Sequence, residues 1–153
     1  MLRTESNSTL IDAVEQLEVA LQTPFVPGEM VNWAEAVRRS LTALHSPLNE
    51  QLNQVHHRTI KQIALEDPEL SARAANLKQA DEQSMQQFER LLQRVQNLPE
   101  RVDQAEPDES SMESELREMI DDGLKFVLAV RGQETAIGTW MSESLNRDSG
   151  EGD

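Results

Sequence analysis

The stretch LKQADEQSMQQFERLLQRVQNL, residues 77–98, decides the fold class of this chain. Its inward-facing positions recur at alternating steps of four and three residues, which is typical of a helix packed in a bundle. These positions are Leu77, Asp81, Ser84, Phe88, Leu91, Val95 and Leu98. Glutamine, glutamate and arginine fill most of the other positions, and all three favour helix. We therefore expect a long helix from about Pro68 to Asn97.

The segment before this helix contains a second regular pattern. Its apolar positions are Leu10, Val14, Leu17 and Leu21. Ser8 or Thr9 is the expected N-cap, because a hydroxyl can accept a hydrogen bond from the first free backbone amides. The two prolines of TPFVPGE, residues 23–29, end this helix.

A longer amphipathic segment is expected from about Glu29 to Leu65. Its apolar stripe comprises Met30, Ala34, Val37, Leu41, Leu44, Leu48, Leu52, Val55 and Ile63. Pro47 lies inside the segment and predicts a kink or a brief break there. Asp67 followed by Pro68 predicts an N-cap with proline at the first helical position, which ends one helix and begins the next.

A last helix is predicted beyond an acidic, apolar-poor connection, PERVDQAEPDESSMESE, residues 99–115. Asp108, Ser110 or Ser111 is the expected cap. The inward positions are Leu116, Ile120, Gly123, Val127, Val130, Glu134, Ile137 and Met141. Four such segments predict an all-α, antiparallel up-down-up-down four-helix bundle, residues 1–145, followed by a flexible acidic tail, residues 146–153. A helical solenoid is the competing architecture.

Composition limits the function classes. The 153 residues include 28 acidic and 14 basic side chains, for a net charge of -14. Nucleic acid and anionic membrane surfaces require a cationic face, so neither is an expected partner. A basic protein surface or a cation fits better, although acidity also serves solubility. With no cysteine, no signal-like N-terminus and no membrane-length apolar run, we expect a soluble, cytoplasmic protein.

Polar residues interrupt the predicted core at Asp81 and Glu134. The adjacent histidines of the second segment point in different directions around the predicted helix. Taking Leu52 as zero and turning about 100° per residue places His56 near 40° and His57 near 140°. His56 therefore faces the bundle and His57 faces solvent. His45 falls on the inner face too, but it lies about 16 Å along the axis from His56, too far to share an ion.

Two interpretations account for His56, Asp81 and Glu134. A buried carboxylate needs a partner or a proton, so the three can form an internal network, with Glu134 on His56 and with Asp81 on Arg131 or a water, assisted by Ser84. Alternatively, one imidazole and two carboxylates from separate helices suit Fe, Mn or Zn. Both interpretations place the three side chains together.

The stretch IALEDPELSARAANLKQADEQSMQQFERLL, residues 63–92, resembles the middle of the hemerythrin-like, or HHE cation-binding, domain. That family is an up-and-down four-helix bundle, and the order of elements here agrees with it from Ser8 to Met141. The resemblance places the family's ligand positions on Leu52 and His56, on Asp81, and on Val130 and Glu134. The first helix offers no histidine, and Asn7 is nearest to the expected place. With three histidines in the chain, the resemblance implies a bundle without an oxygen-carrying diiron centre.

The resulting prediction is a non-enzymatic regulatory or accessory protein. It would act through protein contacts, as a monomer or homodimer and without a cofactor, on a partner with a basic surface. Met112, Met119 and Met141 are candidates for a helix-binding groove or for core filling. The alternative is a metal-binding sensor or store that uses His56, Asp81 and Glu134 as ligands. No phosphate loop, serine-nucleophile motif or H-E-x-x-H motif supports an enzyme.

Overall fold

The computed structural model describes residues 5–26, 28–103 and 109–151, and the side chains of residues 8–26, 28–98 and 112–143. Within these ranges the chain is helical apart from residues 23–26, 28, 29 and 67, and it has no strand. Four long helical units are present: α1 (Glu5–Gln22), a second unit from Met30 to Glu66, α4 (Ser71–Asp103) and α5 (Glu109–Glu151). The all-α bundle class is therefore confirmed. None of these helices is both long and apolar enough to cross a membrane.

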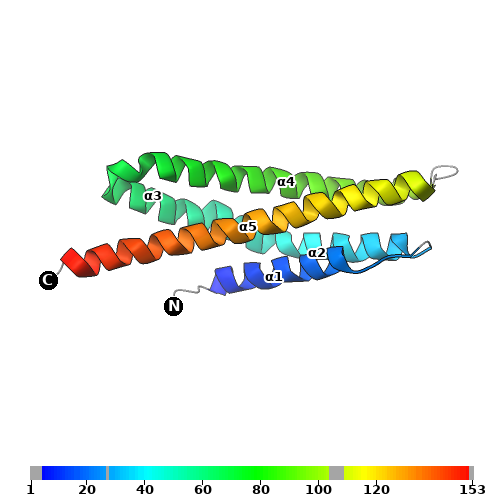
Figure 1. The fold of residues 1–153 in the computed structure, drawn as a ribbon, viewed down its shortest axis with the longest axis horizontal. Coiled ribbons are helices and arrows are strands. Elements are labelled where there is room, and N and C mark those ends of the chain that lie inside the picture. The colour runs from blue at the N-terminus through cyan, green and yellow to red at the C-terminus, as the bar shows by residue number, and fades with distance from the viewer. Residues whose placement is uncertain (1–4, 27, 104–108, 152–153) are drawn as a thin grey trace.

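The helices lie side by side along one long axis (Figure 1). α1 packs against α2 and α5, while α4 packs against α2, α3 and α5. The first residues of α2 and α5 lie toward one end in Figure 1, and the α3–α4 turn lies at the other. α1 is much shorter than α5, with 18 residues against 43. It accompanies only part of the length of α5 (Figure 1).

The second unit is a continuous helix with a change of winding. It consists of α2 (Met30–Asn49), a π-helical segment η1 (Glu50–His56) and α3 (His57–Glu66). The predicted kink or break at Pro47 is thus replaced by wider winding just beyond it. Pro47 supplies no backbone N–H, and the amide of Glu50 shares the carbonyls of Ser46 and Pro47. A π-helix bonds each amide to the carbonyl five residues back and is most often a short insertion within an α-helix.

The spacing of the buried side chains explains this winding. Leu44, Leu48, Leu52, His56 and Ile60 are all buried and follow one another at steps of four. In an α-helix, a step of four advances the side chain by about 40°, so four such steps rotate the stripe by about 160°. The wider π turn compensates for this drift. It keeps the five side chains directed at the core.

The helix boundaries correct several predictions. α1 begins at Glu5, before Ser8 and Thr9, so neither is its N-cap. The turn before α4 is as predicted: the Asp67 carboxylate accepts a hydrogen bond of 3.1 Å from the amide of Glu69, and Pro68 opens a short 3₁₀ turn (η2, Pro68–Leu70). Helix covers most of the predicted 99–115 connection, because α4 extends to Asp103 and α5 begins at Glu109.

Two further expectations concern the ends of α5. Ser110 and Ser111 lie within α5 and are not its caps, while Asp108 is outside the described residues. The helix continues to Glu151, through most of the segment 146–153 for which the sequence predicted a flexible tail.

Gly123 of α5 allows α1 to approach closely, because a Cβ at this position would lie 2.7 Å from Leu21 Cδ1.

The core consists of two clusters of buried side chains. The large cluster draws on all four units and includes Leu17, Leu44, Phe88 and Phe126. Among the described side chains, the buried members of the small cluster come from α3, α4 and α5. They are Ile60, Ile63, Ala74, Ile137 and Trp140. The large cluster therefore lies along the part of the bundle that α1 covers, and the small cluster lies near the α3–α4 turn.

Candidate functional site

A layer of polar side chains separates the two clusters. On the second unit, His56 lies between Leu52 of the large cluster and Ile60 of the small one. On α4, Asp81 lies between Phe88 and Leu77, which belong to the large and the small cluster respectively. Glu134 of α5 likewise lies between Val130 and Ile137. One polar group from each of three helices therefore meets at the same level of the bundle.

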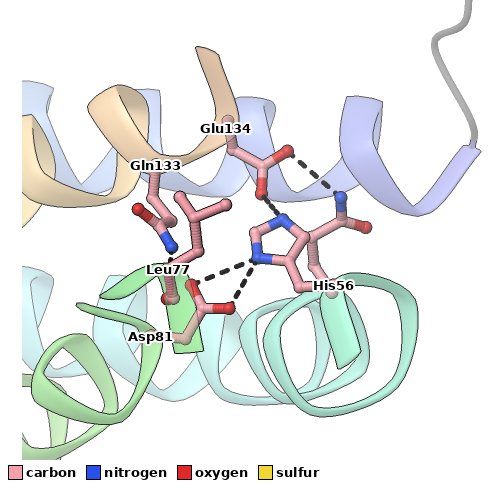
Figure 2. A network of polar contacts seen from close by, with 6 residues as sticks. His56, Leu77, Asp81, Gln133 and Glu134 are labelled. Atoms are coloured by element: carbon pink, nitrogen blue, oxygen red, sulfur yellow. Dashed lines mark hydrogen bonds and ion pairs between the residues drawn. The ribbon is translucent and has the colours of Figure 1, made fainter. Parts of the chain in front are cut away.

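His56 is the centre of this layer (Figure 2). Its side chain is 1% exposed. The ring Nδ1 lies 3.0 and 3.2 Å from the two carboxylate oxygens of Asp81, and Nε2 lies 2.5 Å from Glu134 Oε1. The second contact is an ion pair that is not aligned as a hydrogen bond. Both carboxylates are nearly buried as well, so the three groups face one another away from the surface.

The electrostatic balance makes His56 a cation. Burial by itself lowers the pKa of an imidazolium, because desolvation disfavours the charged form. The hydrogen bond with Asp81 and the interaction with Glu134 outweigh burial and raise the pKa of His56 to about 9. The imidazolium carries a proton on both ring nitrogens. His56 therefore neutralises one of two buried carboxylates, and the layer retains one negative charge.

Two glutamines extend the layer. Gln51 of η1 donates from Nε2 to Glu134 Oε2 at 3.1 Å, so Glu134 is held by two residues of the same π-helical segment. Gln133 donates from Nε2 to the backbone carbonyl of Leu77 at 2.6 Å and links α5 to α4 (Figure 2). Both glutamines are buried. The layer thus joins the second unit to α5, and α5 to α4.

The π-helical winding is what brings Gln51 and His56 to the same carboxylate. In an α-helix, residues five apart differ by about 140° around the axis. In a π-helix, the hydrogen bond runs between residues five apart, so these residues lie one above the other. Gln51 and His56 are the second and last residues of η1. The unusual winding therefore supplies Glu134 with two partners from one helix.

Much of the predicted placement is found. The structure brings His56, Asp81 and Glu134 together, and it leaves His57 exposed, as helical phase predicts. His45 is exposed, with its ring centroid 5.8 Å from that of Phe88, so its predicted inward placement is wrong. The α-helical phase used for that prediction does not hold across the wider turn of η1.

Other predicted members of the network lie elsewhere. Arg131 does not reach Asp81, because its guanidinium pairs with Glu18 of α1, 2.5 Å from Nη1 to Oε2. Asp81 is satisfied by His56 instead. Ser84 is buried one turn from Asp81, yet among the described residues its hydroxyl makes no hydrogen bond to the layer. The sequence pattern did not predict Gln51 and Gln133, which lie beside the predicted inward positions. The four-residue spacing of the buried positions from Leu44 to Ile60 indicates a change of helical winding, and it could have identified Gln51.

The geometry bears directly on metal binding. A metal ligand must be a neutral imidazole with a free lone pair, whereas both ring nitrogens of His56 face carboxylates. Asp81 faces Nδ1 and Glu134 faces Nε2, so the two carboxylates lie on opposite edges of the ring (Figure 2). Within the described residues, no group of three ligating side chains is arranged to hold an ion. Metal binding at His56 would require the imidazole to lose a proton.

The positions that the hemerythrin resemblance assigns to metal ligands are apolar in some cases and polar in others. Leu52 and Val130 are apolar and buried in the large cluster. His56, Asp81 and Glu134 form the polar layer described above. The side chain of Asn7 lies outside the described residues. No protein-family model matches the chain, and neither a curated protein nor a solved structure does.

Proposed function

We propose that this chain is a non-enzymatic regulatory or accessory protein of the cytoplasm that acts through protein–protein contacts. In this proposal its topology is an antiparallel up-down-up-down bundle of hemerythrin-like form, in which the internal ion pairs of His56 replace a diiron site. The binding partner is an amphipathic helix with an apolar face and basic flanks. A groove at the end of the bundle away from the α3–α4 turn supports the proposal.

The groove lies between α2, α4 and α5 and is lined mainly by apolar side chains. They are Met30, Val31, Ala34, Val95, Leu98, Met112 and Leu116. Val31 is 52% exposed and Met30 is partly buried, so the lining is open to solvent. An apolar face of a partner helix is the usual occupant of such a groove. Methionine lining adapts to different side chains.

Charge indicates the flanks of the partner. Glu35 and Arg38 line the groove and pair with each other, and this hydrogen bond lowers the pKa of the Glu35 carboxyl. With a net charge of -14 on the chain, an approaching basic segment is attracted and an acidic one is repelled.

Of the three predicted groove methionines, Met112 lines this groove, whereas Met119 is buried in the core and Met141 packs on the small cluster.

Binding of synthetic helices tests this function. The probe is a leucine–lysine amphipathic peptide, compared with a scrambled peptide of equal charge and with a leucine–glutamate peptide. We expect calorimetry to detect binding of the first peptide only. Val31→Glu should abolish this binding, whereas Leu128→Glu, the same change at an exposed site of α5 outside the groove, should leave it intact. Equal loss in both variants, or equal binding of the scrambled peptide, would contradict the proposal.

A further inference from the structure

A second depression lies on the outer surface of the α3–α4 hairpin, between η1 and α3 on one side and α4 on the other. Its floor contains the apolar side chains Leu52, Ile60 and Ala64. Three basic side chains, His57, Lys61 and Lys78, also line it. The space measures about 650 Å³, including volume open to solvent.

Lysine is scarce in this chain. Acidic side chains outnumber basic ones by 28 to 14, and the chain contains only three lysines, of which two line this depression. Among the described residues neither Lys61 nor Lys78 has a carboxylate within ion-pair distance, and both are exposed. The two ammonium groups therefore line a shared space in which neither is held by an ion pair.

The carboxylates at the depression do not remove this positive character. Asp81 also lines it, but both of its carboxylate oxygens lie within 3.2 Å of Nδ1 of His56. Glu82 also lines it and is exposed, so it offsets one ammonium at most. The depression thus combines an apolar floor with an excess of donors that favour an anion. Asn53 adds an amide that can donate to the same group.

We propose that this depression binds a small organic anion. The ligand carries a carboxylate or phosphate head on a short apolar chain. Lys61, Lys78 and His57 hold the head, and Leu52, Ile60 and Ala64 accept the chain. The site is separate from the apolar groove and borders the buried polar layer at Asp81, and it adds a small-molecule ligand to a protein that is otherwise proposed to bind helices.

Amide chemical-shift mapping with four probes tests the site: hexanoate, hexyl phosphate, inorganic phosphate and hexylammonium, each at millimolar concentration. We expect hexanoate or hexyl phosphate to shift the amides of residues 53–64 and 78–82 in a saturable manner. The stronger of the two identifies the head group. Inorganic phosphate should bind more weakly, because it lacks the chain. Saturable shifts from hexylammonium of the same size, or no shift at these amides from either organic anion, would overturn the proposal.

A matched pair of double variants separates the site from overall charge. Lys61→Gln with Lys78→Gln should weaken binding about tenfold, which corresponds to two partly screened charge contacts. Arg90→Gln with Lys125→Gln removes the same charge from the polar groove between α4 and α5 and should leave the affinity unchanged. All four side chains are exposed, so both variants should fold. Equal weakening in the two variants would show a general charge effect and overturn the site.

Discussion

The two halves of the bundle differ in how they are held together. The large cluster has four helical units around it and contains residues such as Leu44, Phe88 and Phe126 that are fully buried. The small cluster has three units around it, five buried members and no described side chain of α1. The His56 layer lies at the boundary. On one side of the layer, the fourth helix α1 adds buried apolar surface. At the layer itself, ion pairs and two glutamines connect the other three helical units.

This difference suggests that the two halves open independently. Regions with fewer buried apolar contacts unfold locally at lower free energy than the global transition. The small cluster meets that description, and the polar layer interrupts apolar continuity between the halves. The half without α1 is expected to open first, with the layer as its boundary.

The largest expected effect comes from truncating each cluster. Phe88→Ala should lower the free energy of unfolding by about 3–5 kcal/mol, because it removes a fully buried ring from the large cluster. Ile63→Ala should cost about 2 kcal/mol in global stability, near the lower end for such truncations, because local opening of the small cluster limits the loss. Urea unfolding with native-state hydrogen exchange measures both. Equal global losses, with uniform exchange across α3 and α2, would show that the halves are one cooperative unit.

Removing the cation of the layer should have an effect of similar size. His56→Leu leaves two buried carboxylates without their counter-charge, and breaking a buried pair in this way costs about 3–5 kcal/mol. Adding Asp81→Leu and Glu134→Leu should recover most of the loss, since apolar replacement of a complete buried ion network is often neutral or stabilising. The exposed neighbour provides the control: His57→Leu should change stability by less than about 0.5 kcal/mol. An unchanged free energy of unfolding for His56→Leu, measured by urea unfolding, would mean that the layer carries no charge.

Stability should also depend on pH through His56. Its folded-state pKa, about 9, lies above the ordinary value of about 6.5, so the folded protein binds this proton more tightly than the unfolded chain. The resulting stabilisation is complete below about pH 6.5, is lost as pH rises through about 9, and amounts to roughly 3 kcal/mol. Urea midpoints of wild type and His57→Gln should fall across this window, whereas those of His56→Gln should not. Parallel profiles of all three would contradict the assignment.

A smaller effect tests the contribution of the π-helical segment. Gln51→Ala removes the hydrogen bond to the Glu134 carboxylate and should cost about 1.5–3 kcal/mol. Gln54→Ala changes the same residue type on the exposed side of η1 and should cost less than about 0.5 kcal/mol. Thermal unfolding compares them. Equal costs would mean that Gln51 does not reach Glu134.

The sequence predicts the fold class and the centre of the layer for a physical reason. Asp81 and Glu134 interrupt otherwise regular apolar seams, and a regular seam fixes which side of a helix faces the core. The second unit departs from this regularity. Its winding changes at η1, so α-helical phase places His45 inward and Gln51 outward, the reverse of what the structure shows. Arg131 is predicted beside Asp81, but it pairs with Glu18 of α1 instead.

Ionisation of the His56 ring tests the central claim of this account most directly, namely that His56 is an internal cation between two buried carboxylates. Nitrogen-detected NMR should show both ring nitrogens of His56 protonated at neutral pH, with a titration midpoint at about 9. Arg131→Gln should leave this midpoint unchanged, because Arg131 pairs with Glu18 outside the layer. A neutral ring at pH 7, with one nitrogen unprotonated and able to accept Zn(II), would contradict the account and restore the metal-binding alternative.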